Sequence, residues 1–164
     1  LIDIIKIATI EYLSSQIVAG AEVVKIFDSW AGSLSGTDIL KYSYEPIYQI
    51  SCELKKRHPS VPVIAFPRGV GGGYEIFSKI ETISCLAVDQ SVPSAWAQKL
   101  QENVVIQGNM DPLLLVTGGE KLETEVKDIL DNLASKPFVF NLGHGITPDA
   151  DVNNVYKLIE LIRK

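Results

Sequence analysis

Three side chains with useful chemistry follow short apolar runs of the sequence. His144 stands between two glycines after the run 138–142, Ser29 closely follows 23–27, and Arg68 closely follows 61–66. An imidazole exchanges protons near neutral pH, a guanidinium binds carboxylates, and a serine hydroxyl hydrogen-bonds polar ligands. Arg68 is therefore a candidate for binding a carboxylate, and Ser29 a candidate for hydrogen-bonding a polar substrate. From the residues alone, His144 is interpreted equally well as a turn residue, because glycines also permit tight turns.

Other residues after the apolar runs have weaker claims on chemistry. The glycine run 69–73 matches neither phosphate-loop pattern, GxxxxGK[ST] or GxGxxG, so an active-site loop is the favoured interpretation. Asp28, Asp89 and Asp111 are predicted to cap helices or brace loops, as aspartates at strand ends commonly do. No HxxE, HxH or DxD spacing involves these three aspartates, which argues against their being metal ligands.

Composition limits the class of protein. The chain has 164 residues, 46% of them hydrophobic and 21% charged, which predicts one globular domain with a full core. A net charge of −5 argues against electrostatic binding of nucleic acid. No apolar run is long enough to predict a membrane span. Cys52 and Cys85 stand apart from each other and from any CxxC motif, which favours reduced thiols in a cytosolic protein.

Helical and strand patterns alternate along the chain and must position the candidate residues. Strands are predicted over 23–27, 61–66, 84–88, 104–107 and 138–142, and helices up to Val18 and over 38–57, 74–80, 94–100, 120–133 and 151–162. Helical crossovers between strands predict a parallel sheet with ligands bound at the carboxyl ends of the strands. By length alone, an open five-stranded sheet is favoured over a (β/α)8 barrel, which needs about 250 residues.

Several longer motifs carry a resemblance that reverses this preference. The stretches FDSWAGSLS (27–35), QGNMDPLLL (107–115) and FNLGHGITPDADVNNVYKLIELI (140–162) resemble the carboxy-terminal half of uroporphyrinogen decarboxylase. GAEVVKIFDSWAG and VIAFPRGVG fit the same family in the same order. The resemblance covers essentially the whole chain and implies the later part of a (β/α)8 TIM barrel, with residues 1–164 as a single incomplete domain. A start at Leu1, without methionine, agrees with that expectation.

The resemblance also implies a reaction. Members of the family convert the four acetate side chains of uroporphyrinogen III to methyl groups, giving coproporphyrinogen III and CO2 without a metal or organic cofactor. They are cytosolic homodimers of haem biosynthesis. Ser29 of FDSW and His144 of GHG match substrate-site positions of the family: Ser29 is expected to hydrogen-bond the substrate, and His144 to contact a carboxylate or assist proton transfer. Arg68 is a candidate for the pocket wall on its chemistry alone.

Two departures from the family limit what this chain is expected to do alone. The arginine-rich motif, the aspartate that orients the substrate and a substrate-contacting tyrosine normally precede the segment that begins at Leu1, so the isolated chain is expected to be inactive. Gln90 replaces the usual tryptophan, which leaves Asp89 as a loop brace. The alternatives are an open-sheet ligand-binding module that uses the glycine run and a corrinoid methyltransferase barrel, whose zinc ligands have no counterpart here.

Overall fold

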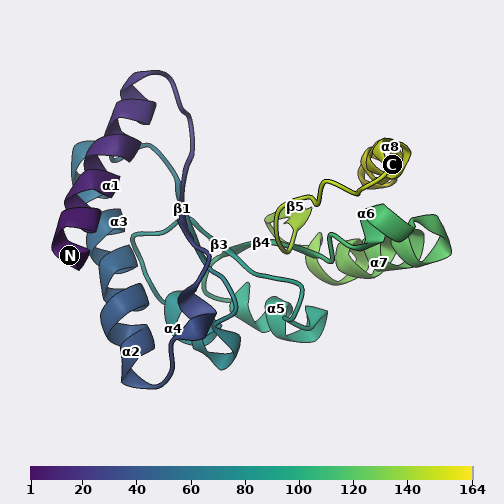
Figure 1. Ribbon diagram of the computed structural model, residues 1–164, viewed down its shortest axis with the longest axis horizontal. Helices are drawn as coiled ribbons and strands as arrows, with labels where there is room; N and C mark the ends of the chain where they lie inside the picture. Colours follow the sequence, from purple (N-terminus) through teal and green to yellow (C-terminus); the bar gives the residue numbers. More distant parts are fainter. Residues whose placement is uncertain (164) are drawn as a thin grey trace. The chain divides into compact units, whose positions relative to one another are not determined.

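The computed structural model describes residues 1–163 and contains five strands that alternate with helices (Figure 1). The internal contacts divide the chain into two compact units, Leu1–Leu86 and Ala87–Lys164. Unit 1 and unit 2 are described separately below. None of the helices within residues 1–163 has the length and apolarity that crossing a bilayer requires.

Unit 1 is a parallel sheet covered by two long helices. The strand order is β1 (Val24–Asp28), β2 (Val63–Pro67) and β3 (Cys85–Ala87), and the last residue of β3 belongs to unit 2. β1 and β2 pair in parallel along their whole length. The remaining elements are α1 (Ile2–Val18), η1 (Ala31–Ser33), α2 (Thr37–Ile39), the π-helical η2 (Leu40–Tyr44), α3 (Glu45–Arg57), η3 (Gly71–Gly73) and α4 (Tyr74–Phe77). Figure 1 shows α1 and α3 side by side.

Alternate residues of β1 point to opposite faces of this sheet. Val24 and Ile26 are buried, on the face that α1 and α3 cover. Lys25 and Phe27 point to the other face, where the Phe27 ring is 65% exposed. A charged residue and an open aromatic ring on the second face show that this face is not part of the core of unit 1.

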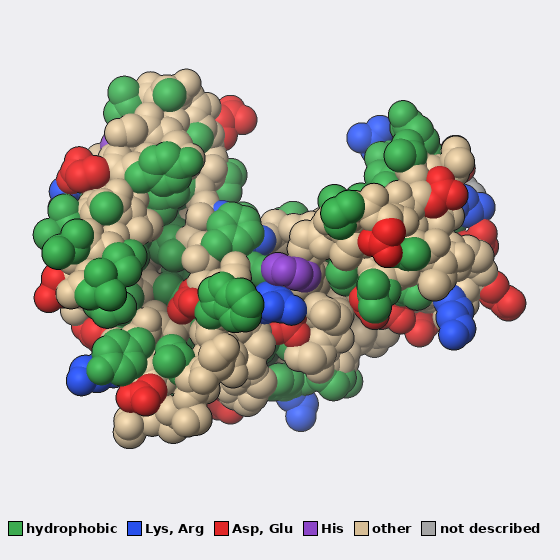
Figure 2. Space-filling view, in the orientation of Figure 1, with side chains coloured by type: hydrophobic (Ala, Val, Ile, Leu, Met, Phe, Trp, Pro, Cys, Tyr) green, Lys and Arg blue, Asp and Glu red, His purple; other side chains and the backbone are tan. Residues whose placement is uncertain are grey.

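Helix α1 is apolar on nearly every side. Leu13 is its one buried residue, while large apolar side chains remain exposed at Ile4, Ile7 and Val18. Figure 2 shows apolar side chains on the surface of this part of unit 1. A helix that is apolar all round is normally buried, so the outer face of α1 is suited to contact with further protein.

Unit 2 contains a parallel pair of strands and four helices. β4 (Val105–Met110) pairs with β5 (Phe138–Leu142), from Ile106 opposite Phe138 to Met110 opposite Leu142. The helices are α5 (Ser94–Leu100), α6 (Leu114–Thr117), α7 (Gly119–Leu133) and α8 (Val152–Ile162). Helix α7 buries four residues at helical spacing: Leu122, Val126, Ile129 and Leu133. Asp151 caps α8, because its carboxylate accepts a hydrogen bond from the Asn153 backbone nitrogen at 2.8 Å.

Three of the predicted elements differ most from the sequence-based expectation. The helix predicted over 38–57 is interrupted by η2, which brings the Ser43 hydroxyl inward to Asp28. The helix predicted over 74–80 ends at Phe77, because the next turns use i→i+3 hydrogen bonds. The strand predicted over 104–107 continues to Met110, since pairing with β5 overrides the weak strand preference of glycine and asparagine. The other strand boundaries agree to within two residues.

Candidate functional site

Two of the predicted site residues, Ser29 and Arg68, lie in adjacent turns at the carboxyl ends of β1 and β2. We call Asp28, Ser29, Gly32, Arg68 and Gly69 the first cluster. The Arg68 backbone nitrogen donates to the Asp28 carbonyl oxygen at 3.0 Å, and the Gly32 nitrogen donates to the Arg68 carbonyl oxygen at 2.9 Å. These two hydrogen bonds tie the turns together. Ser29 and Arg68 are both half-buried, so their side chains can reach a ligand.

A close approach of two glycines makes this arrangement possible. A β-carbon at Gly32 would lie 2.6 Å from the carbonyl oxygen of Gly69 and 2.9 Å from its α-carbon. Because these atoms are backbone atoms, no side-chain motion relieves the contact. Gly69 has a φ of +79°, a conformation that other residues rarely adopt. Both glycines are therefore needed for the two turns to lie against each other.

Asp28 acts as a brace in the first cluster. Its Oδ2 atom accepts a hydrogen bond from the Ser43 hydroxyl at 2.6 Å, and Ser43 is only 1% exposed. Ser43 belongs to η2, and π-helical insertions commonly occur near functional sites because they redirect a side chain. The bond fixes the aspartate that immediately precedes Ser29, as the sequence-based interpretation of Asp28 as a brace predicts.

The Arg68 guanidinium retains capacity for a ligand. Its Nε atom is buried and has no hydrogen-bond partner within residues 1–163. An unsatisfied buried donor of a charged group costs free energy, and a bound carboxylate would remove that cost. Arg68 is therefore the group of the first cluster that is best suited to bind an anion.

Beside the first cluster, the second face of the sheet carries an aromatic pair and a lysine. The rings of Phe27 and Phe66 meet edge to face with centroids 6.1 Å apart, and Lys25 Nζ lies 4.7 Å from each centroid. Burial lowers the pKa of Lys25, and the nearby Cys85 opposes that shift. This face offers apolar ring surface, through Phe27, next to a cation.

His144, the third predicted site residue, follows β5 in unit 2. Asp89, Gln90, Asn109, Gly143 and His144 form the second cluster. The Gly143 nitrogen donates to the Met110 carbonyl oxygen at 2.7 Å, and His144 is exposed. The Asp89 carboxylate accepts a hydrogen bond from the Ser91 nitrogen at 2.8 Å, so Asp89 braces its loop as predicted.

The two glycines beside His144 differ in their surroundings. A β-carbon at Gly143 would overlap the Gln90 backbone nitrogen and lie 2.9 Å from the Asp89 carbonyl carbon, whereas one at Gly145 would meet nothing within 4 Å. Neither has a positive φ. Gly143 is thus required for close backbone packing, and this contact places the residue before His144 against the loop that begins at Asp89.

The structure reveals contributors that the sequence patterns did not single out. Ser43 and Asn109 are buried polar residues whose hydrogen bonds hold loops of the two clusters. Phe27 was predicted only as part of a strand. A lysine at position 25, inside an apolar strand, was the available signal that one face of that strand lies outside the core. The partners of Ser43 and Asn109 are 15 or more residues away in sequence, so local patterns do not indicate them.

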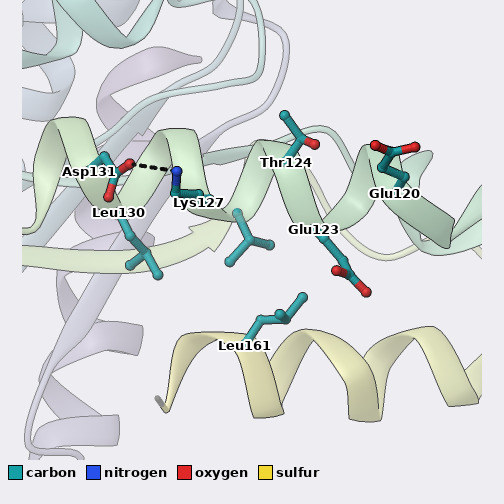
Figure 3. Close-up of a pocket in the computed structure, with 8 residues that line it drawn as sticks. Glu120, Glu123, Thr124, Lys127, Leu130, Asp131 and Leu161 are labelled. Carbon is teal, nitrogen blue, oxygen red and sulfur yellow. Dashed lines mark ion pairs between the residues drawn. The ribbon is translucent and has the colours of Figure 1, made fainter.

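A groove elsewhere in unit 2 does not fit the predicted chemistry. It lies between α7 and α8, and its lining includes Glu120, Glu123, Lys127 and Asp131 of α7 and Leu161 of α8 (Figure 3). Lys127 pairs with Asp131 at 3.8 Å and Lys157 pairs with Glu123 at 3.0 Å, which leaves Glu120 as the net charge of this lining. An acidic groove repels carboxylates, and it lies on helices instead of at strand ends. We therefore take the first cluster as the candidate site of unit 1 and the second cluster as the candidate site of unit 2.

Comparison with known proteins gives one consistent family. The family model described as Uroporphyrinogen decarboxylase (URO-D) matches residues 1–164. A relative named uroporphyrinogen decarboxylase from Jannaschia sp. (strain CCS1) is 54% identical over 164 residues, covering 99% of this chain and 48% of the relative. A relative of the same name from Paracoccus denitrificans (strain Pd 1222) is 52% identical with the same coverage. The chain therefore spans about half the length of these curated relatives.

One solved structure supports the fold. A methyltransferase from Methanosarcina mazei superposes with a TM-score of 0.78 and 22% sequence identity, covering 98% of this chain and 47% of the other. At this identity the match bears on fold alone. Together with the alternation of parallel strands and helices, it confirms the predicted fold class, part of a (β/α)8 barrel. The open five-stranded sheet favoured by length alone is therefore wrong.

Proposed function

We propose a function from one premise: this chain belongs to the uroporphyrinogen decarboxylase family. The protein that contains it removes carboxyl groups from the four acetate side chains of uroporphyrinogen III, releasing CO2 and giving coproporphyrinogen III. The observation that carries the proposal is the match of the family model to residues 1–164. Relatives named uroporphyrinogen decarboxylase, at 54% and 52% sequence identity, agree with it. The polar groups at the strand ends provide a physical rationale.

Ser29 and Arg68 are assigned to binding of the substrate's carboxylates. The chain has a net charge of −5, so a polyanionic substrate needs a local cation to offset long-range repulsion. The Arg68 guanidinium, whose buried Nε has no hydrogen-bond partner within residues 1–163, supplies that cation, and the Ser29 hydroxyl adds a hydrogen-bond donor. Phe27 offers its exposed ring to the apolar part of the macrocycle.

His144 is assigned to carboxylate contact and proton transfer. Protonation of a pyrrole carbon makes the substrate's own ring an electron sink, so the carbon–carboxylate bond breaks and its electron pair enters the ring. A proton then adds to the methylene carbon and the ring proton is lost, so each acetate becomes a methyl group with net uptake of one proton and loss of CO2. An exposed imidazole between two glycines is suited to deliver or relay such a proton.

The activity belongs to the longer protein. The chain spans 48% of its relatives, and the family's arginine-rich motif, orienting aspartate and substrate tyrosine have no counterpart within it. We therefore expect the isolated chain to bind substrate weakly and to turn none over. The longer protein is proposed to be a cytosolic homodimer, as the family implies.

A reconstitution assay tests the proposal. Anaerobic uroporphyrinogen III is incubated with this chain, with the separately produced amino-terminal half of the Jannaschia relative, and with both, and the products are separated by chromatography after oxidation. We expect products with fewer carboxyl groups only in the mixture, and a large loss of rate with Ser29→Ala or His144→Asn. Turnover by this chain alone would refute the expected inactivity. If the two halves associate in the mixture but the substrate remains unchanged, the decarboxylase function is refuted.

The structure gives little support to the phosphate-binding alternative. The glycine run ends in η3 and is followed by α4, which has only four residues. So short a helix presents little dipole to an anion. Nucleotide binding by the glycine run is therefore not proposed.

A further inference from the structure

Asn109 holds both ends of a loop in the second cluster. It lies near the end of β4 and is 6% exposed. Its Nδ2 atom donates to the Asp89 carbonyl oxygen at 3.1 Å and to the Val92 carbonyl oxygen at 2.7 Å. One carboxamide thus uses both of its N–H donors to close the loop 89–92.

The loop that Asn109 closes is also ordered from within. The Val92 nitrogen donates to the Asp89 carbonyl oxygen at 3.1 Å, and the Ser91 nitrogen donates to the Asp89 carboxylate at 2.8 Å. These short-range bonds fix the shape of the loop, but all of them lie inside it. The two bonds from Asn109 connect both ends of the loop to β4.

The closed loop packs against the backbone of Gly143 from one side. The Gln90 backbone nitrogen and the Asp89 carbonyl carbon lie where a side chain on residue 143 would start. On the other side, the Gly143 nitrogen donates to the carbonyl oxygen of Met110, the residue after Asn109. Residue 143 is therefore confined between β4 and the loop, and His144 follows directly.

We propose that Asn109 is a positioning residue: by closing the loop 89–92 around Gly143, it fixes the backbone from which the His144 imidazole projects. The inference rests on the function proposed above, in which His144 contacts the substrate. It goes beyond that function, because it assigns a role to a buried residue.

Two substitutions separate positioning from simple packing. Asn109→Ala removes both donors and part of the volume, whereas Asn109→Asp preserves the shape and replaces the donors. Near neutral pH the aspartate carboxylate would face two carbonyl oxygens and repel them, and on protonation it regains one donor. The matched control is Asn132→Ala, because Asn132 Nδ2 also donates to a backbone carbonyl oxygen, that of Asp128 at 2.7 Å, but on α7.

The test is amide hydrogen exchange, measured by NMR on the isolated 164-residue chain. With Asn109→Ala, we expect protection of the Gly143 amide to fall by at least about tenfold, with shifted His144 resonances, whereas Asn132→Ala changes both by less than about twofold. With Asn109→Asp, protection of Gly143 should recover as the pH falls from about 8 to about 5. Such pH-dependent recovery is not expected if the side chain only fills space.

Two results would overturn the inference. One is unchanged protection of Gly143 in both variants; the other is an Asn109→Asp variant whose Gly143 protection does not respond to pH. If Asn109→Ala fails to fold, the isosteric Asn109→Asp variant still decides the question. Because the measurement needs neither substrate nor turnover, its failure is distinct from failure of the reconstitution assay. In that assay, Asn109→Ala is expected to lower kcat more than it changes KM.

Discussion

Replacement of Gly143 with alanine tests whether close backbone packing fixes the turn that carries His144. The added methyl group would overlap the Gln90 backbone nitrogen and lie 2.9 Å from the Asp89 carbonyl carbon. Gly143 does not have a positive φ, so alanine meets no backbone strain of its own and the whole cost comes from these contacts. We expect the β5 turn and the loop 89–92 to move apart.

The expected magnitude follows from the kind of atoms involved. Overpacking that displaces backbone typically costs about 1–3 kcal/mol. With a urea m-value of about 2 kcal/mol per molar, the unfolding midpoint should fall by roughly 0.5–1.5 M. Urea titration followed by circular dichroism measures this shift, and the NMR resonances of His144 report whether the displacement reaches the imidazole.

Gly145→Ala is the matched control on the other side of the histidine. A β-carbon there meets nothing within 4 Å and Gly145 lacks a positive φ, so the change should be neutral or stabilise by up to about 1 kcal/mol through the unfolded state. Equal midpoints for the two variants would refute the argument that Gly143 is required for packing. A larger loss from Gly145→Ala would refute it as well.

Three further predictions concern unit 1. Gly32→Ala places a β-carbon 2.6 Å from a backbone carbonyl oxygen and should cost about 1–3 kcal/mol in urea titration, whereas Gly72→Ala, in open space and without a positive φ, should leave the midpoint nearly unchanged. Ser43→Ala removes the donor to Asp28 and should cost about 1–2 kcal/mol; a double-mutant cycle with Asp28→Asn that shows no coupling would contradict this. Burial raises the pKa of Cys85 to about 11, so its alkylation in the folded chain, followed by mass spectrometry, should remain slow at about pH 9. In the unfolded chain the Cys85 thiol ionises at a lower pH than in the folded chain. The contribution of Cys85 to the free energy of unfolding should therefore fall as the pH rises from about 9 to about 11.

Sequence patterns predicted well those helices and strands whose bounds are determined by the spacing of apolar residues within the element itself. The helix 94–100 and the strand 138–142 have the predicted boundaries. Helix α7 begins at Gly119, one residue before the predicted 120–133, and ends at Leu133 as predicted, because its apolar stripe extends to that residue. The extension of β4 through Gly108 and Asn109 depends instead on β5, whose pairing no local window contains.

The same distinction between local and long-range determinants applies to the residues of the two clusters. Ser29, Arg68 and His144 were identified by residue type and by their place after a strand, and their chemical roles stay predictions. The residues that hold them, Ser43 and Asn109, act through partners distant in sequence. A buried serine or asparagine in an apolar segment resembles an ordinary core position until its hydrogen-bond partner is known.

The exposed isoleucines of α1 have a practical consequence for the colloidal behaviour of the chain. Exposed apolar surface on a helix favours reversible association at high protein concentration, and salts such as sulfate strengthen that tendency because they are excluded from protein surfaces. Light scattering of the purified chain should therefore rise with sulfate concentration well before any change in its circular dichroism. Ile4→Lys and Ile7→Lys should suppress the scattering without altering the helix, because both side chains point outward.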